Sequence, residues 1–296
     1  MQQVLLGALS LGLLWSVMTI GVYITFRILS IADMTVEGTI TLGAAVTARV
    51  ISTGGSPWLG LGLALLAGLL AGLVTGLLHT KLGIPALLSG ILTMIALFSI
   101  NLRVMGKATI SLLRMDIVYT PFIGLGLDKN TSIIVLGTAL ALAVISILYW
   151  FFGTEIGSAI RATGNNPNMV RAQGVHTDTT IILGLMISNA LVGVSGSMIA
   201  QAQNFADLQM GTGAIVIGLA SMIIGEVLFG RSNFYLRLTA MVLGAITYRI
   251  IIALVLKMGM PSDDLKLFTA ITVVFALSLP KIRAWAAGLM AGRRRA

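Results

Sequence analysis

The side chains that could take part in specific recognition gather in the longest polar segment of the chain, residues 153–180, which reads GTEIGSAIRATGNNPNMVRAQGVHTDTT. They offer charged and amide groups for docking rather than a nucleophile with its base. The pattern predicts a short helix over 155–163 that Gly164 ends. A second short helix is expected, with Asn166 as its cap, Pro167 in its first position and Gly174 at its end.

These two helices would present a modest apolar patch together with Arg161 and Arg171. Such a surface suits docking to a soluble partner, but a helix that rests on lipid would look the same. The residues alone leave the two interpretations evenly balanced.

Reactive side chains are scarce elsewhere. The chain has no cysteine, so disulfides, thiolate metal sites and cysteine nucleophiles are excluded. Its two histidines, His79 and His176, are too few for a histidine-based metal centre, and no metal site is predicted. No nucleophile stands with a base, and the phosphate-binding pattern G-x-x-x-x-G-K-S/T does not occur. We therefore expect no catalytic residue and no enzyme activity in this chain.

Polar residues inside apolar segments are candidates for a solute pathway, because burying them in a bilayer is costly. Two threonines open one short segment, and three amides precede another. For Asn189, well inside its segment, a hydrogen bond between helices is favoured over contact with substrate. The predicted pathway residues are Thr39, Thr41, Met94, Asn189, Gln201, Gln203 and Asn204.

Long apolar blocks must position these residues. Hydrophobic residues make up 57% of the 296 and charged residues only 10%, whereas a soluble domain carries about 25% charged residues. Blocks of this kind predict membrane-crossing helices and not the alternating segments of a barrel. We predict an all-α polytopic membrane protein with about 8–10 transmembrane helices in one domain, 1–296, with spans at 4–26, 39–53, 58–79, 85–104, 131–152, 180–201, 212–229, 235–256 and 265–280.

The first of these spans is interpreted as retained, not as a cleaved signal, because no basic region or cleavage pattern accompanies it. The second and seventh are short and rich in glycine, so we expect them to be broken or tilted. In the third span Gly68, Gly72 and Gly76 share one helix face and allow another backbone to approach closely. Packing within the subunit is favoured for this face, and a dimer contact is the alternative.

Orientation follows from the basic residues. The net charge of +9 is explained more simply by membrane orientation than by nucleic acid, because the positive residues lie between apolar blocks and in the tail 281–296. That tail is predicted to be cytoplasmic. Four spans separate it from the segment 153–179, which is then cytoplasmic too. Five spans precede that segment, so the N-terminus is expected outside.

An internal repeat is suggested by residues 31–46 and 205–220. Ala32-Asp33 corresponds to Ala206-Asp207, and after a slip of one residue two glycines and an alanine also match. Chance similarity in so apolar a chain is the alternative. If the repeat is real, five spans separate its copies, and the halves 1–152 and 180–280 are inverted relative to each other, as in many transporters.

The segment 157–175 resembles the cytoplasmic coupling loop of ABC importer permeases of the branched-chain amino acid and ribose type. The matching residues are Gly157, Arg161, Ala162, Asn166, Pro167, Ala172 and Gly174. Further resemblance covers 33–45, 82–94 and 211–226, and is strongest to the branch associated with tryptophan or tyrosine uptake. The residues expected to contact an ATPase are Glu155, Gly157, Arg161, Ala162, Asn165, Asn166, Pro167, Arg171, Ala172, Gly174 and His176.

The resemblance implies a bacterial inner-membrane permease subunit in which two copies, a homodimer being favoured, form the pathway. Separate ATPase subunits would bind ATP and Mg, so this chain needs no cofactor, and a binding protein outside would deliver the solute. A hydrophobic or aromatic amino acid is the favoured solute.

Two other classes of protein have less support from the residues. A secondary transporter would want a buried carboxylate, and Asp33, Glu37 and Asp207 are available, but all three lie at predicted span ends. A membrane enzyme lacks any supporting constellation of residues.

Overall fold

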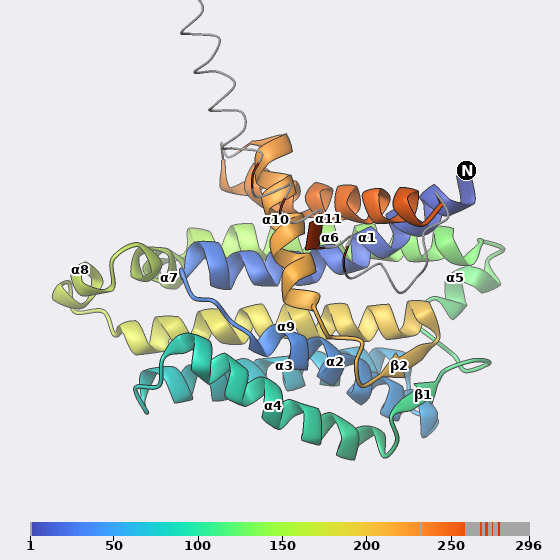
Figure 1. Cartoon of the computed structure of the whole chain (residues 1–296), viewed down its shortest axis with the longest axis horizontal. Helices are drawn as coiled ribbons and strands as arrows, with labels where there is room; N and C mark the ends of the chain where they lie inside the picture. Colours follow the sequence, from blue (N-terminus) through green and yellow to red (C-terminus); the bar gives the residue numbers. More distant parts are fainter. Residues whose placement is uncertain are drawn as a thin grey trace, which may run out of the picture.

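A computed structural model describes residues 2–230 and 233–257, together with single positions at 267, 270, 271, 274 and 278. The tail 281–296 and nearly all of the predicted span 265–280 lie outside the described residues. The described chain is a bundle of helices with one two-stranded pairing (Figure 1), and its elements are α1 Gln2–Tyr23, η1 Ile24–Ile28, α2 Thr35–Ser52, α3 Pro57–Thr80, α4 Ala86–Met105, β1 Thr109–Ser111, α5 Thr120–Gly124, α6 Lys129–Gly153, α7 Glu155–Asn165, α8 Pro167–Ala172, α9 Thr177–Gln203, β2 Phe205–Asp207, α10 Ala214–Phe229 and α11 Phe234–Lys257.

Six of the described helical segments are long and apolar enough to cross a membrane, and they are Gln3–Ile28, Pro57–Thr80, Ala86–Met105, Lys129–Gly153, Thr177–Gln203 and Phe234–Lys257. Two further helices, α2 and α10, correspond to the short spans expected at 39–53 and 212–229. The prediction of an all-α polytopic membrane protein is confirmed. The start of α2 differs from the prediction, because the helix begins at Thr35, four residues before the predicted start.

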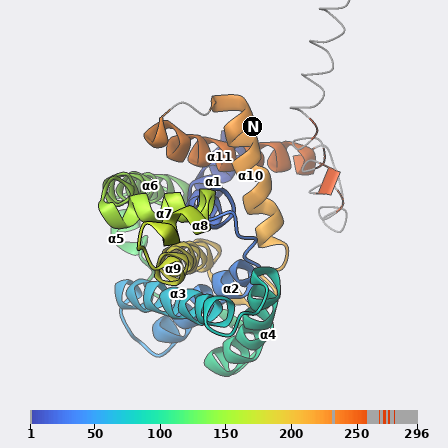
Figure 2. The ribbon, with the colours of Figure 1, turned by 90° about the vertical axis from the view of Figure 1, so that its left-hand side faces the viewer.

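The helices α1 and α9 form the centre of the bundle and run in opposite directions (Figures 1 and 2). Ser188 Oγ donates to the Gly21 carbonyl at 2.7 Å, and Ser195 Oγ donates to the Leu14 carbonyl at 2.8 Å. Seven residues forward along α9, from Ser188 to Ser195, therefore correspond to seven residues back along α1, from Gly21 to Leu14. The two helices are antiparallel. Buried hydroxyls here bond to backbone carbonyls, so no polar group of these pairs is left unsatisfied.

Two pairs of helices, α2 with α3 and α10 with α11, pack on this central pair in equivalent ways. α2 and α3 both contact α9, while α10 and α11 both contact α1, and α2 packs on α3 as α10 packs on α11. The two matched aspartates also have the same local geometry. Asp33 Oδ1 accepts from the Thr35 N–H at 2.9 Å, and Asp207 Oδ1 accepts from the Gln209 N–H at 2.8 Å. Equivalent contacts are thus exchanged across the antiparallel pair α1 and α9, and the inverted repeat stays a prediction.

Glycines set the closest approaches between helices. A Cβ on Gly68 or Gly72 would meet the backbone of α9 at Asn189 or Leu185, and one on Gly76 would lie 3.0 Å from the Ile182 Cα. The glycine face of α3 therefore packs against α9 within the subunit. Leucines on the other faces of α3, such as Leu66 and Leu70, are exposed, as expected of a surface in contact with lipid.

Candidate functional site

The polar segment 153–180 forms two short helices, α7 and α8, that extend beyond the bundle at one end (Figure 1). The side chain of Thr154 caps α7 by accepting from the Gly157 N–H at 3.3 Å. Asn166 caps α8 through its Oδ1, which accepts from the Met169 N–H at 3.1 Å, and Pro167 occupies the first turn. Gly174 has φ +85°, a left-handed conformation that suits glycine.

Gly164 does not end the first helix, which continues to Asn165, so this prediction was wrong. A Cβ at Gly164 would collide with the Ile28 carbonyl of η1. The glycine is therefore needed for close contact between α7 and the end of the continuous helical segment that α1 and η1 form, called here the α1–η1 rod. Asn166 ends the helix instead, because its backbone has the non-helical angles φ −154° and ψ 92°.

The tip of this two-helix unit is open to solvent. The exposed residues among those predicted to contact an ATPase are Glu155, Asn165, Asn166, Pro167, Arg171, Ala172, Gly174 and His176, whereas Gly157 is buried and Arg161 and Ala162 are half-buried. Two large apolar side chains, Ile156 and Met169, are exposed among them at 54% and 48%.

The inner faces of the two helices join the unit to the bundle. Ile160 and Val170 are buried, at 0% and 1%. The guanidinium of Arg161 lies 5.7 Å from the ring centroid of Phe234, the first residue of α11. At the other end of the unit, Arg171 Nε donates to Thr177 Oγ1 at 2.6 Å. The unit is thus fixed to η1, α9 and α11.

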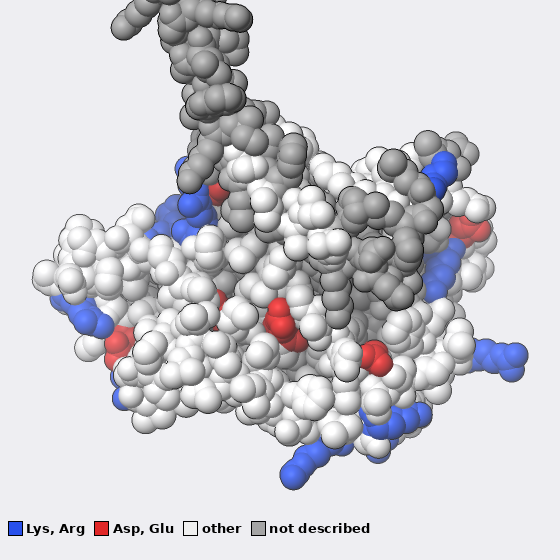
Figure 3. Space-filling model, viewed as in Figure 1, with Lys and Arg blue, Asp and Glu red and all other residues white. Residues whose placement is uncertain are grey.

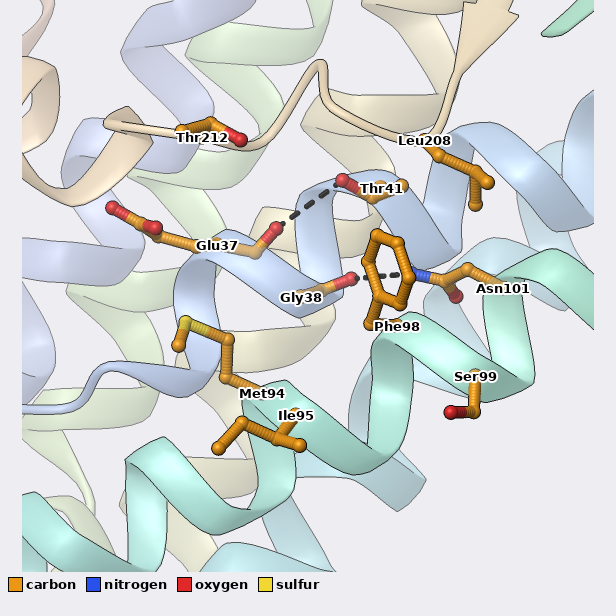
Figure 4. A pocket seen from close by; sticks show the side chains of 10 residues that line it. All are labelled: Glu37, Gly38, Thr41, Met94, Ile95, Phe98, Ser99, Asn101, Leu208 and Thr212. Atoms are coloured by element: carbon orange, nitrogen blue, oxygen red, sulfur yellow. Dashed lines mark hydrogen bonds between the residues drawn. The ribbon is translucent and has the colours of Figure 1, made fainter. Parts of the chain in front are cut away.

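A second region, on the side of the bundle, is a pocket of about 350 Å³ between α2, α4 and the segment before α10 (Figure 4). Two of the predicted pathway residues, Thr41 and Met94, line it. The full lining is Glu37, Gly38, Thr41, Met94, Ile95, Phe98, Ser99, Asn101, Leu208 and Thr212.

The pocket lies where two short helices begin. Glu37 is in the first turn of α2, and its Oε1 accepts from the Gly213 N–H at 3.1 Å, at the start of α10. The positive end of a helix dipole favours an anionic group in this position. A Cβ on Gly211 would collide with the Glu37 carbonyl, so the chain before α10 crosses close over α2.

The other predicted pathway residues do not line this pocket. Thr39 Oγ1 donates to Asn189 Oδ1 at 2.8 Å, and Asn189 Nδ2 donates to Asp33 Oδ2 at 2.7 Å, so these residues form a buried network between α2 and α9. Gln201 is buried and accepts from the Val118 N–H at 2.8 Å. Gln203 is exposed at the end of α9, and Asn204 ends that helix with φ 60°.

Sequence reasoning missed two features of this region. Asp33 and Glu37 were expected at span ends, but Asp33 is only 1% exposed and Glu37 lines the pocket. The reason is that α2 begins inside the bundle, after a non-helical return from the end of η1 (Figure 1). The lining residue Phe98 was not singled out, and an aromatic residue on an apolar helix gives no sequence signal for a pocket.

Comparison with known proteins gives the family. The family described as "Branched-chain amino acid transport system / permease component" matches residues 4–277. The chain is 40% identical over 274 residues to the tyrosine transport system permease protein of Clostridioides difficile (strain R20291), covering 93% of this chain and 90% of that protein. It is 32% identical over 282 residues to an uncharacterised protein of Rickettsia prowazekii (strain Madrid E), covering 94% and 98%. No solved structure matches.

The fold and these matches define a multi-pass membrane permease. The chain belongs to the branched-chain amino acid transport system permease family, which confirms the resemblance inferred from the segment 157–175.

Proposed function

We propose that this chain is the permease subunit of an ATP-driven importer, and that the tip of α7 and α8 binds a separate ATPase subunit. The proposal rests on the structure of this tip. Side-chain caps on Thr154 and Asn166 shape it, and apolar Ile156 and Met169 stand exposed beside Arg171. In this proposal ATP and Mg bind only to the ATPase.

The contacts of α7 provide a route for coupling. Closure of an ATPase pair would displace α7, which touches η1 through Gly164 and Ile28 and touches α11 through Arg161 and Phe234. Of these two elements, α11 packs on α10, the short helix beside the pocket, and η1 is joined to α10 by the ion pair between Arg27 and Glu226. A movement of the tip would in this way reach the pocket and switch its access from one side of the membrane to the other.

The pathway is proposed to lie between two copies of the chain. Glu37 lines an open pocket on the side of the bundle, and acidic atoms show within a largely uncharged part of that face (Figure 3). A charged side chain facing lipid at mid-depth costs about 2.5–3.5 kcal/mol on insertion scales. If a second copy of this chain covered the face, Glu37 would no longer face lipid, and a water-filled pathway would be enclosed between the two copies.

The proposed solute is a hydrophobic or aromatic amino acid. The pocket combines apolar Ile95 and Phe98 with polar groups, and the Clostridioides difficile relative is described as a tyrosine permease. An extracytoplasmic binding protein would deliver the solute. We further propose the bacterial inner membrane, with α7, α8 and the basic tail in the cytoplasm and the N-terminus outside. The N-terminus lies at the end of the bundle opposite α7 and α8 (Figure 1), as this orientation requires.

One observation favours a second candidate, a secondary transporter that works without an ATPase. Asp33 is a buried carboxylate, and Glu37 lines the pocket, so groups able to carry a coupling ion are present. The description of the family as the permease component of a transport system favours the first candidate.

Reconstitution with a candidate ABC ATPase subunit from the same genome separates the two. Uptake of labelled amino acids into proteoliposomes should require ATP on the side of the membrane where the ATPase is bound. Met169→Asp should abolish co-purification of the ATPase, because a charge replaces an exposed apolar contact. The matched control is Leu125→Asp, which changes a residue 79% exposed in the turn between α5 and α6 and should leave the complex intact. Uptake driven by an ion gradient without any ATPase would refute the proposal.

A further inference from the structure

Three arginines line one polar pocket at the end of the bundle that carries α7. The pocket has a volume of about 580 Å³, and Arg27, Arg161 and Arg237 reach it from η1, α7 and α11. Glu226 of α10 is the one acidic residue in its described lining, so these four residues carry a net charge of +2. An excess of positive charge in a hollow of the surface favours an anionic ligand.

The single carboxylate does not neutralise the three guanidinium groups. Glu226 accepts from both Nε and Nη2 of Arg27, and its side chain is only 6% exposed. Arg161 forms no ion pair with a carboxylate of the described residues. Its Nη2 donates to Ser158 Oγ at 3.3 Å, and its guanidinium lies over the Phe234 ring. A guanidinium has five N–H donors, so Arg161 keeps donors for a ligand.

Arg161 and Arg237 are close enough to share one ligand. The guanidinium of Arg161 lies 5.7 Å from the ring centroid of Phe234, and Arg237 follows Phe234 by one turn of α11. Residues three apart on a helix are neighbours, with about 5–6 Å between their Cβ atoms. All three residues line the pocket, so the two guanidinium groups flank the same space.

The neutral polar residues of the lining suit the same ligand. Ser30 and Asn165 are exposed, and their hydroxyl and amide groups can donate to an anionic oxygen. The buried Tyr23 adds a third such group. The polar lining is thus rich in donors, whereas both oxygens of its one carboxylate already accept from Arg27.

Aromatic residues place the pocket at the surface of the membrane. A neighbouring pocket shares Arg161 and Phe234 with it and is also lined by Tyr149, Trp150 and Tyr235, which are all exposed. Exposed tryptophan and tyrosine near the ends of transmembrane helices lie at the level of the lipid headgroups. The arginines are therefore at the depth of the phosphates of the bilayer.

We propose that this pocket binds the phosphate of an anionic membrane lipid, with Arg161 and Arg237 donating to the phosphate oxygens. Guanidinium groups bind phosphate through paired N–H donors, and basic pockets between transmembrane helices bind anionic headgroups. A zwitterionic lipid carries its own cationic group, which the net positive charge of the lining disfavours. The site goes beyond the proposed function. Because Arg161 belongs to α7, the bound lipid would hold the base of that helix.

The test is native mass spectrometry of the full-length permease in a neutral detergent, which resolves bound molecules by their mass. The probes are phosphatidylglycerol, which is anionic, phosphatidylcholine, which is zwitterionic, and glycerol phosphate, which has no acyl chains. At the tightest site phosphatidylglycerol should bind at least about tenfold more strongly than phosphatidylcholine, as expected from hydrogen bonds between charged groups. Glycerol phosphate at the same concentration should not bind, since it lacks the contacts of the acyl chains.

The variant Arg237→Gln removes one charge at an exposed residue, where a change of fold is not expected. It should reduce the preference for phosphatidylglycerol over phosphatidylcholine about three- to tenfold, and Arg161→Gln should act in the same direction. A general structural defect would weaken both lipids alike. The matched control Arg103→Gln removes an exposed basic charge in the last turn of α4, outside the pocket, and should keep the preference.

Equal binding of the two lipids to the unaltered permease, or an unchanged preference in both arginine variants, would overturn this inference. Binding of glycerol phosphate as strong as that of phosphatidylglycerol would show a site for free phosphate and would also overturn it. Arg237→Gln should leave co-purification of the ATPase intact. If co-purification is lost while the lipid preference stays, the arginines belong to the interface with the ATPase and the lipid site is refuted.

Discussion

Arg27 and Glu226 form a two-pronged ion pair, with Nε 2.9 Å from Oε1 and Nη2 3.2 Å from Oε2, although 199 positions separate them in the sequence. The pair joins the end of the α1–η1 rod to the end of α10, close to Arg161 of α7 in one polar pocket. The two halves of the chain are thus joined electrostatically beside the proposed coupling unit.

Reversing one member of this pair should destabilise the protein. Arg27→Glu brings a second carboxylate to Glu226, whose side chain is only 6% exposed. Breaking a fully buried pair costs about 3–5 kcal/mol, and since the Arg27 side chain is 42% exposed we expect roughly 1–3 kcal/mol. The measurement is thermal stability in detergent, and the exchange Arg27→Glu with Glu226→Arg should recover part of the loss.

The control for this experiment is the exposed pair between Lys81 and Asp178, whose Nζ–Oδ2 distance is 3.0 Å. Lys81→Glu should change stability by less than about 1 kcal/mol, because exposed ion pairs contribute little. Equal effects of Arg27→Glu and Lys81→Glu would contradict the role given to the Arg27–Glu226 pair.

The buried network of Asp33, Asn189 and Thr39 predicts a reciprocal rescue. In Asp33→Asn the new side-chain amide N–H would face a donor, either Asn189 Nδ2 or the Thr35 N–H. This mismatch should lower the free energy of unfolding by about 1–3 kcal/mol. Asn189→Asp alone sets two buried carboxylates face to face and should be worse. The double exchange restores an amide–carboxylate bond and should be more stable than Asn189→Asp.

Rescue in this double exchange should be partial, because Asn189 Nδ2 also donates to the Leu185 carbonyl at 3.1 Å and an aspartate cannot. A thermal-melt double-mutant cycle gives the coupling energy, which for contacting groups is about 0.5–3 kcal/mol. A double variant no more stable than the sum of the single effects would show that the network does not join α2 to α9.

Adding one methyl group at Gly164 should impair coupling without preventing docking. The Cβ of Gly164→Ala would press on the Ile28 carbonyl, and overpacking of this kind costs about 1–3 kcal/mol. We expect the ATPase to co-purify as before, while uptake per ATP hydrolysed falls. Gly153→Ala is the matched control, since no atom lies within 4 Å of its added Cβ. Normal uptake in Gly164→Ala would contradict the route through η1.

The membrane class and the caps of α7 and α8 could be predicted because they depend on local sequence. Apolar blocks set the spans, and Asn166 followed by Pro167 specifies the start of a helix within a few residues. The depth of Asp33 and Glu37 could not be predicted, because hydropathy marks the end of an apolar run but not a return of the chain into the bundle.

The position of α9 has a consequence for how the chain is made. α9 supplies the surface against which both α2 and α3 pack, and it begins only at Thr177. During synthesis the glycine face of α3 and the polar groups of Asp33 and Thr39 must therefore wait in the bilayer without their final partners until about residue 203 has been inserted. The first half of the chain therefore cannot complete its packing before α9 is inserted. In any product truncated before α9 these groups would stay uncovered, and we expect quality-control proteases of the membrane to degrade such a product.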